Sequence, residues 1–389
     1  MKVIAHRLRE ISHPVHRMLS ELGYRDFVAD EDWRHNLIST TSVEYMPARR
    51  TVMCGLTSFA NDLMYEFDLA TGKFISLNYQ KVSEKFEIKI HRSLHCMRDG
   101  RVMGATACLH REDQRLEAPG GRIFLVNPAT REYDFLGIPV PRDYIQTITV
   151  DEDRGLVYGF TYPVFNFFVF DIATRKCRRV DYMGSLPHIV ALDDCGGYWA
   201  TWSNRTHNLF HYNPDTDVIK FYDHSFPMTP KSCNLMVPDV GPIVPVANSG
   251  QVRPQKRWPS FGGGPIDSMV NGGDGYLYIG ESFGNLDRLD PKTGEIVNLG
   301  KPTEHTRLAA MEVGADGRLY GVSGFFGICH LFAYDTKRGK FEDFGQIVDS
   351  QSGVPLFIGH DMCFVGDRRI IIGETDTADR AGYLWECAF

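Results

Sequence analysis

Short apolar strands alternate with polar turns along almost the whole chain, and one phrase of this pattern recurs six times. Each copy is an aromatic or aliphatic strand, an Asp or Asn, a short polar turn and a second strand. The copies lie at 65–72, 124–130, 168–174, 210–216, 286–294 and 332–339. Asp and Asn close tight turns with their own side chains, so each copy predicts a β-hairpin.

A second kind of hairpin precedes these phrases, with an apolar strand, an Asp or Gly turn and a strand that ends in glycine or alanine. Its seven copies lie at 46–55, 97–104, 150–159, 192–200, 270–280, 313–321 and 364–373. The basal period of about 40 to 45 residues fits one four-stranded propeller blade. Seven inner hairpins therefore predict an all-β fold, a seven-bladed β-propeller.

The two ends of the chain are predicted to complete one blade together. The last blade reaches only a third strand at 383–386, so a strand from the first 40 residues is expected to close the ring. Segment 12–23 begins with a serine and an early proline, continues with an apolar stripe and ends in glycine, which predicts one short helix. We therefore expect a helix and ring-closing strand in 1–40 and a propeller over 41–389.

Composition supports one large domain and excludes several partners. The chain has 389 residues, of which 43% are hydrophobic, and a closed propeller uses that length as a single core. A formal net charge of −7 argues against nucleic acid or an anionic membrane as a partner. No apolar run approaches a membrane span of about 18 residues, and no signal peptide is recognisable, so a cytoplasmic location is expected. Nine cysteines without paired spacing fit reduced thiols.

Two insertions interrupt the period, at 106–121 and at 228–264, and both are expected to overhang the same face of the propeller. The longer insertion is locally cationic in an otherwise acidic chain, which suggests an anionic small molecule or oligosaccharide as ligand. A solvated loop without a specific role is the alternative. The residues in it that we expect to bind substrate are Arg253, Lys256, Arg257 and Trp258.

One residue per blade is predicted to lie at the mouth of the central channel. Counting back from each inner strand gives Thr41, Ser93, Gln146, His188, Asp267, Ala309 and His360. Within this ring Gln146, His188 and His360 could hold a divalent metal, manganese or calcium, that would bind a carboxylate and acidify its α-proton. The alternative is that these side chains hydrogen-bond to channel waters and neighbouring loops.

Proton abstraction next to a carboxylate needs a base, a group that neutralises the acid and a donor for the leaving oxygen. We expect these roles to fall to His95, Tyr162, His188 and Arg205. His91, beside the position of the second blade, and His110, in the first insertion, are expected to bind substrate. Tyrosine and arginine are also ordinary loop residues, so a structural role for them stays open.

The Asp-Pro-x-Thr-Gly and Asp-Gly-x-Leu-Tyr-Gly hairpins resemble the blade signature of the streptogramin lyases, gluconolactonase-like proteins and oligogalacturonate lyases. The resemblance covers roughly residues 43–389. It implies the propeller fold and, in the enzymes of the group, a metal at the axis of one face. Oligogalacturonate lyases have histidines and a glutamine there, which His188, His360 and Gln146 match. A gluconolactonase-type enzyme would instead use acidic and Asn ligands.

These observations favour a carbohydrate-active lyase that cleaves a uronate-containing oligosaccharide by β-elimination. Two alternatives remain. One is a metal-dependent lactonase or other hydrolase, which would form no unsaturated product. The other is a non-catalytic propeller that binds an anionic sugar or a protein on the same face.

Overall fold

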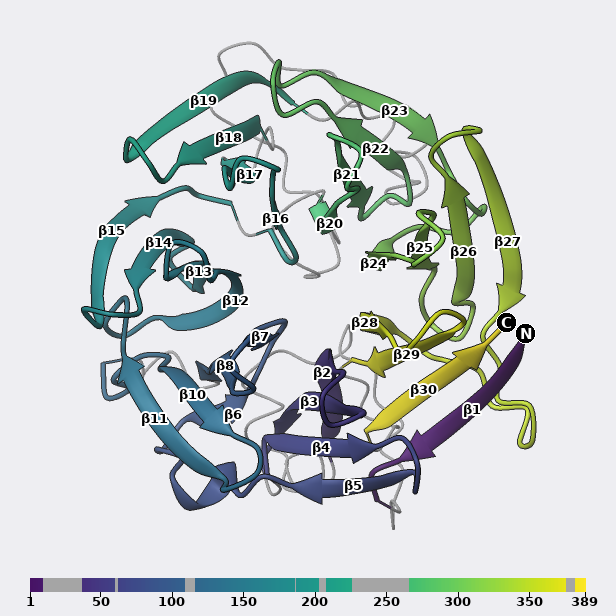
Figure 1. The fold of residues 1–389 in the computed structure, drawn as a ribbon, viewed down its shortest axis with the longest axis horizontal. Helices are drawn as coiled ribbons and strands as arrows, with labels where there is room; N and C mark the ends of the chain where they lie inside the picture. Colours follow the sequence, from purple (N-terminus) through teal and green to yellow (C-terminus); the bar gives the residue numbers. More distant parts are fainter. Residues whose placement is uncertain are drawn as a thin grey trace.

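The structure is a computed structural model that describes residues 1–9, 37–59, 62–108, 116–185, 187–202, 208–225, 266–375 and 382–389. Its strands form seven antiparallel sheets, placed one after another around a central axis (Figure 1). Each sheet is one blade, with its first strand beside the axis and its last strand at the rim. The predicted seven-bladed, all-β propeller is therefore confirmed.

The first three blades follow the chain from the axis outward. Blade 1 consists of β2 (Ile38–Met46), β3 (Thr51–Ser58), β4 (Met64–Asp68) and β5 (Lys73–Ser76), and its sheet also includes β6 (Glu87–Lys89) and β9 (Ala107–Cys108). Blade 2 consists of β7 (Leu94–Cys96), β8 (Val102–Ala105), β10 (Ile123–Asn127) and β11 (Glu132–Gly137). Blade 3 consists of β12 (Tyr144–Asp151), β13 (Leu156–Tyr162), β14 (Asn166–Asp171) and β15 (Lys176–Tyr182).

The remaining blades repeat this order. In the sheet of blade 1, a 3₁₀ turn (Tyr79–Lys81) precedes β6. Blade 4 consists of β16 (Ala191–Leu192), β17 (Tyr198–Trp202), β18 (Asn208–Asn213) and β19 (Val218–Ser225). Blade 5 consists of β20 (Ile266–Asn271), β21 (Leu277–Glu281), β22 (Leu286–Leu289) and β23 (Ile296–Gly300). Blade 6 consists of β24 (Leu308–Val313), β25 (Leu319–Ser323), β26 (His330–Asp335) and β27 (Lys340–Gln346). Blade 7 consists of β28 (Gly359–Phe364), β29 (Arg369–Glu374), β30 (Tyr383–Ala388) and β1 (Lys2–Arg7).

Blade 7 combines both ends of the chain, as the sequence predicted. Strand β1 pairs antiparallel with β30 from Lys2 opposite Ala388 to Arg7 opposite Tyr383. The Arg7 guanidinium donates a hydrogen bond of 2.7 Å to the Tyr383 hydroxyl. The N and C labels accordingly lie side by side in Figure 1. The ring is thus closed by main-chain hydrogen bonds between distant segments.

Two features of the repeat have a direct physical cause. The Asp68 carboxylate accepts the backbone N–H of Ala70 at 2.8 Å, which closes the outer hairpin as its sequence predicts. The glycine near the end of the second strand leaves room for a phenyl ring on the third. A Cβ at Gly104 would lie 2.3 Å from the ring of Phe124, its partner across the sheet. Any larger side chain at that position would displace the ring.

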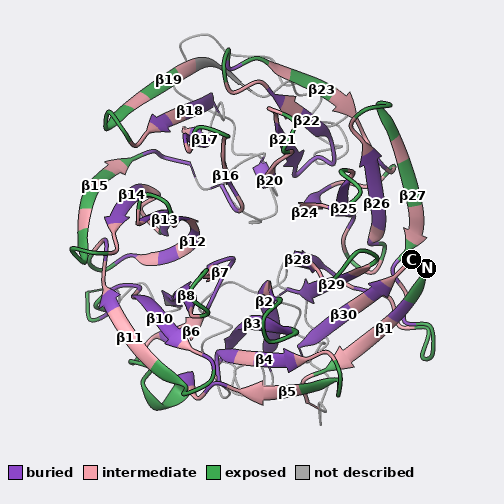
Figure 2. Ribbon diagram, in the orientation of Figure 1, coloured by how far each residue is buried: buried purple, intermediate pink, exposed green. Residues whose placement is uncertain are grey.

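The core lies between neighbouring blades, where aromatic side chains from two sheets pack face to face. Between blades 3 and 4, the ring of Tyr198 lies 5.1 Å from that of Tyr158 and 5.2 Å from that of Phe167. All three are fully buried. Figure 2 shows that the middle strands of the blades are mostly buried, whereas residues of the outermost strands are mostly intermediate or exposed. Burial of this kind stabilises by about 1.5–3 kcal/mol per large side chain.

Several predicted segments lie outside the described residues. These are the helix at 12–23, the insertion 228–264 and residues 109–115 of the insertion 106–121. The start of the latter insertion contains β9, which pairs with β6 beside blade 1. Among the described residues no helix has the length and apolar character that crossing a membrane requires. The described cysteines are free thiols.

Candidate functional site

Five of the inner strands carry a β-bulge at the residue that the sequence predicted to face the axis. In each of these strands the register with the second strand skips one residue, which is Thr41, Gln146, Asp267, Ala309 or His360. A bulged residue is left out of the sheet ladder and its backbone groups need other partners. The bulges therefore direct both side chains and unpaired carbonyl oxygens toward the channel.

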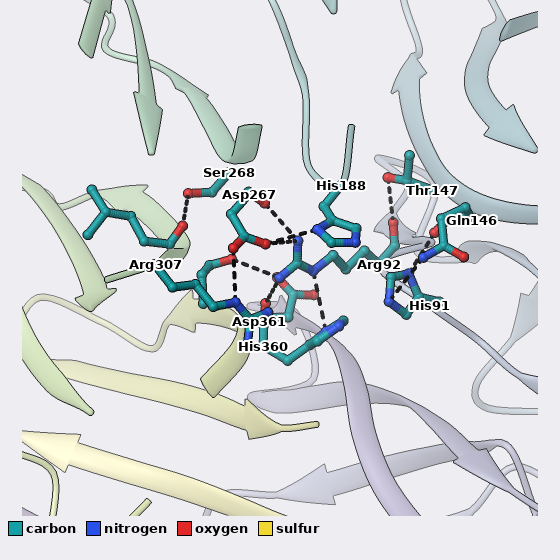
Figure 3. A network of polar contacts seen from close by, with 12 residues as sticks. His91, Arg92, Gln146, Thr147, His188, Asp267, Ser268, Arg307, His360 and Asp361 are labelled. Atoms are coloured by element: carbon teal, nitrogen blue, oxygen red, sulfur yellow. Dashed lines mark hydrogen bonds and ion pairs between the residues drawn. The ribbon is translucent and has the colours of Figure 1, made fainter. Parts of the chain in front are cut away.

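Arg92, which directly precedes Ser93 and β7, crosses the axis and bonds these carbonyl groups (Figure 3). Its Nη1 donates to the carbonyl oxygen of Asp267 at 2.7 Å. Its Nη2 donates to the carbonyl oxygens of Ala309 at 2.9 Å and His360 at 2.7 Å. Its side chain is 1% exposed. One guanidinium from blade 2 therefore joins the inner strands of blades 5, 6 and 7.

The Asp267 carboxylate is the anionic centre of this network. It accepts hydrogen bonds of 2.9 Å from Nδ1 of His188 and from Nε of Arg307, and it lies 3.6 Å from Nη1 of Arg92. Burial alone would raise the pKa of Asp267, but the charge of Arg307 and the hydrogen bond from His188 hold it well below the usual value. Asp267 therefore stays ionised although it is fully buried.

Three histidines lie around Arg92 (Figure 3), and each has a hydrogen-bond partner at Nδ1. Nδ1 of His188 bonds the Asp267 carboxylate, Nδ1 of His91 bonds the Gln146 carbonyl at 2.8 Å, and Nδ1 of His360 bonds the Thr41 carbonyl at 2.9 Å. For His188 and His91 these oxygens only accept, so Nδ1 carries the hydrogen and Nε2 keeps its lone pair. Nδ1 of His360 also lies 3.3 Å from the Nε–H of Arg92, which can only donate, so these contacts define no single tautomer for His360. The ring of His91 lies 4.6 Å from that of His360 and 5.7 Å from that of His188.

All three imidazoles are neutral near pH 7. Burial, assisted by the positive charge of Arg92, lowers the pKa of His188 to about 4. Burial likewise holds the pKa of His91 and of His360 well below the usual value for histidine. Neutral imidazoles with a fixed tautomer and an Nε2 lone pair are suited to accept a proton or to bind a cation.

The residues predicted as metal ligands do not fit a metal with Arg92 in place. Among the described residues, no group of three or more His, Cys, Asp or Glu side chains could hold a metal ion. The axial carbonyl oxygens, which are the ligands that calcium prefers, already accept from the guanidinium. Nε of Arg92 lies 3.3 Å from Nδ1 of His360, so a second cation there would be repelled. Of the predicted set, His360 therefore contacts a permanent cation of the chain, whereas His188 bonds Asp267 and Gln146 bonds His91.

The structure brings some of the other predicted residues to this face. Tyr162 ends β13, is 38% exposed and pairs with Tyr144, two residues before Gln146. His95 lies on β7, where its Nε2 bonds Glu152 at 3.2 Å in the turn after β12, and it does not join the axial cluster. The predicted residues outside the described part of the chain are His110, Arg205, Arg253, Lys256, Arg257 and Trp258.

The sequence reasoning missed Arg92, Arg307 and Asp361. Arg92 and Arg307 have backbone φ angles of 47° and 71°, in the left-handed region that non-glycine residues rarely adopt. Such strain concentrates at functional sites. The Asp361 carboxylate accepts the backbone N–H of Val43 at 2.9 Å and so joins blade 7 to blade 1. Counting along the strands selected Ser93 as the axial residue of blade 2 instead of Arg92. The run His91-Arg92-Ser93, which places a cation between two predicted site residues, was the one signal in the sequence that pointed to Arg92.

Comparisons with known proteins connect this fold to one group of structures. No protein-family model matches the chain. No curated protein matches it either. Among solved structures, this chain is similar to a catalytically inactive histidine-to-alanine form of virginiamycin B lyase from Staphylococcus aureus, with quinupristin. The TM-score is 0.60 and the sequence identity is 15%, and the match covers 91% of this chain and 96% of that one. The fold is that of the streptogramin B lyase propellers.

Other similar structures show how widely this propeller is used. A streptogramin B lyase structure matches with a TM-score of 0.58 and 12% identity, covering 100% of this chain and 98% of the other. An extracellular domain assigned to a hybrid two-component system of Bacteroides thetaiotaomicron matches with a TM-score of 0.56 and 13% identity, covering 90% of this chain and 40% of the other. At such low identity the likeness concerns the fold alone, so function must be argued from the site.

Proposed function

We propose that the protein is a lyase that cleaves a uronate-containing oligosaccharide by β-elimination at the axial cluster. The observation that carries the proposal is the pair of His188 and Asp267. Their hydrogen bond of 2.9 Å fixes the imidazole tautomer and leaves Nε2 to accept a proton. A carboxylate behind a histidine also stabilises the imidazolium that forms when the proton is taken.

The reaction moves two protons and two electron pairs, because the α-carbon loses a proton to the base while the leaving oxygen keeps the C–O electrons and gains a proton from a donor. His188 Nε2 takes the proton α to the substrate carboxylate, the C–H electrons form a C=C bond, and the β C–O bond breaks. The leaving oxygen then needs a proton. Our candidate donor is Tyr162, at the end of blade 3 that carries Gln146. Positive charge near the substrate carboxylate makes the α-proton more acidic. Lys89, on β6, is suited to supply this charge, since it is close enough to lower the pKa of both His91 and His360.

The charge of the substrate bears on the strength of the base. A pKa of about 4 makes the His188 imidazole a weak base in the free protein, because burial and Arg92 both disfavour its protonated form. A bound carboxylate would offset part of the positive charge of Arg92 and Arg307 and raise that pKa. The site thereby favours an anionic substrate over a neutral one, consistent with the cationic insertion 228–264.

The test is the ultraviolet absorbance of the protein with a panel of uronate oligosaccharides, since elimination creates a conjugated unsaturated uronate. We expect an increase that survives a divalent-metal chelator and is lost in His188→Ala. His330→Ala is the matched control, because His330 bonds Asp343 on the outer strands of blade 6. If no oligosaccharide in the panel gives an increase, the lyase proposal is wrong.

A second candidate is a non-catalytic propeller that binds an anionic sugar. It is favoured by the observation that the hydrogen bonds of Arg92 go mainly to backbone carbonyls, as in a structural tie. A binder predicts that uronate oligosaccharides bind without forming product and that His188→Ala leaves their affinity within about twofold. The same panel, followed by calorimetry, separates the two candidates.

A further inference from the structure

Two groups of aromatic side chains lie at the same end of the propeller as the axial cluster. The first belongs to blade 3, where the rings of Tyr144 and Tyr162 lie 5.0 Å apart and the rings of Tyr162 and Phe165 lie 5.6 Å apart. Phe165 is in the loop between β13 and β14. We call these three residues the blade 3 aromatic group. Tyr162 is 38% exposed.

The second group is formed by the corresponding loop of blade 6 and the segment that enters blade 7. The rings of Phe325 and Phe326 lie 4.4 Å apart, and those of Phe326 and Phe357 lie 5.6 Å apart. The backbone N–H of Gly327 donates to the carbonyl of Phe357 at 2.8 Å, which holds the two segments together. We call Phe325, Phe326 and Phe357 the blade 6 aromatic group. Phe326 is 39% exposed.

The axial cluster lies between the two groups. On one side, Tyr144 begins the strand that carries Gln146. On the other side, the N–H of Gly324 donates to the carbonyl of Arg307 at 3.0 Å, so the loop of Phe325 starts beside a residue of the axial network. Blades 3 and 6 stand on opposite sides of the ring in Figure 1. An elongated molecule laid across this face would contact aromatic, polar and again aromatic side chains in turn.

Both groups contain a phenylalanine in a conformation that folding alone does not favour. Phe165 has a φ of 58° and Phe326 a φ of 55°, in equivalent loops. A bulky residue in the left-handed region is strained, and glycine would adopt the same turn freely. Local strain that the rest of the fold maintains is characteristic of ligand-binding positions. Phe165 also packs against the hydrophobic core between blades 3 and 4, whereas Phe326 is 39% exposed, so core packing accounts for the strain at Phe326 least.

We propose that the two aromatic groups are stacking subsites for pyranose rings of one saccharide chain, one on each side of the axial cluster. This deepens the proposed function and rests on it for the anionic sugar at the centre. A pyranose presents C–H bonds on its face and hydroxyls at its edge, so it packs on a half-exposed aromatic ring and keeps its hydroxyls in water. A protein partner would favour one continuous apolar patch, whereas here an ionised cluster separates the two groups.

The experiment is calorimetric titration with a uronate hexasaccharide, a uronate disaccharide and a neutral hexasaccharide. We expect Tyr162→Ala and Phe326→Ala each to weaken hexasaccharide binding about tenfold and the double variant about a hundredfold, because the subsites act independently. In Phe326→Ala, disaccharide binding should change by less than about twofold. Phe221→Ala, which removes a 53% exposed ring from the outer strand β19, is the matched control.

Further arms keep the outcomes distinct. Phe326→Gly should weaken hexasaccharide binding as much as Phe326→Ala does. It should also unfold at a higher temperature than Phe326→Ala, because glycine relieves the strained turn. This combination would show that binding was weakened by loss of the ring and not by damage to the fold. If Tyr162→Ala and Phe326→Ala bind like Phe221→Ala, or if neither hexasaccharide binds, the subsites are overturned. A dimer that dissociates in Phe326→Ala would overturn them in favour of a second copy of this chain. If binding depends on the aromatic residues but no unsaturated product forms, the stacking subsites are supported and the proposal of a lyase is wrong.

Discussion

The two ends of the central channel shift the pKa of carboxyl groups in opposite directions. At the Arg92 end, Asp267 is flanked by two guanidinium groups, and its pKa lies well below the usual value because the charge of Arg307 and the hydrogen bond from His188 outweigh burial. Farther along the same inner strands lies Glu44 on β2. Burial, together with the nearby carboxyls of Glu312 and Asp361, raises the pKa of Glu44 to about 8. We call this the Glu44 end.

The difference shows what decides whether a buried carboxyl keeps its charge or its proton. Asp267 is fully buried and Glu44 is half-buried, so desolvation opposes ionisation at each. At the Arg92 end the cations are close enough to reverse that effect. At the Glu44 end neighbouring carboxyls add to it, and burial also raises the pKa of Glu312 to about 7 although it accepts the N–H of Phe364 at 2.7 Å. The channel thus lowers the pKa of a carboxyl at one end and raises the pKa of carboxyls at the other.

The largest expected effect is the loss of Arg92. Arg92→Met should lower the free energy of unfolding by about 3–5 kcal/mol, because it removes a buried cation and leaves three carbonyl oxygens without their donor. Urea unfolding measures this. Arg98→Met is the matched control, since the side chain of Arg98 is 70% exposed and solvent screens its surface ion pair, so its loss should leave the free energy of unfolding nearly unchanged. Equal losses in both variants would show that Arg92 does not tie the blades.

The Glu44 end should make stability depend on pH. A carboxyl whose folded pKa is raised contributes stability that is present below its unfolded pKa and is lost as pH rises through its folded pKa. Wild-type stability should therefore fall between pH 4.5 and about 8 as Glu44 is forced to ionise. Glu44→Gln should flatten that slope and be about 2 kcal/mol more stable than wild type at pH 9. Thermal unfolding across this pH range provides the measurement, and an unchanged slope would contradict the assignment.

A smaller effect concerns the base itself. The imidazole of His188 should titrate at a pKa of about 4, because burial and the charge of Arg92 oppose its protonation. Arg307→Met removes one of the neighbouring positive charges and should raise that pKa, whereas Asp267→Asn removes the stabilising carboxylate and should lower it. Nuclear magnetic resonance of carbon-13-labelled histidine follows the titration. A shift in the same direction in both variants would refute the charge balance described for this end of the channel.

The smallest expected effect is that of added metal. Since the Arg92 guanidinium bonds the axial carbonyls, manganese or calcium should shift the thermal midpoint of the wild type by less than about 1 °C, as should a chelator. Arg98→Met serves again as the control with an unaltered axis. A rise of several degrees with either ion would restore the predicted ligand set of Gln146, His188 and His360.

The fold was predictable because its determinants are local and repeated. Turn residues such as Asp68 and strand glycines such as Gly104 act within one hairpin, and seven copies identify the blade even where a single copy is ambiguous. The unfinished last blade also indicated closure by an N-terminal strand. These features need only nearest-neighbour contacts, which a sequence displays directly.

The site was only partly predictable because its central contacts join residues far apart in the chain. The ring positions were reachable by counting, since each blade repeats the same strand. The register at Asp267 or His360 depends on a bulge, however, and a bulge moves the following side chains by one position. That Arg92 spans the channel to blades 5, 6 and 7 is a property of the closed ring, and no local pattern records it.

The pairing of β1 with β30 has a consequence for how the molecule is made. Arg7 and Tyr383, which hydrogen-bond across this pair, are 376 residues apart in the chain. During synthesis β1 is therefore produced first and has no strand to pair with until β30 has emerged. Contacts of such long range form slowly, because the loop between them must close before they are gained. Until closure both edges of the unfinished ring are open to strands of other chains, so we expect refolding yield to fall as protein concentration rises.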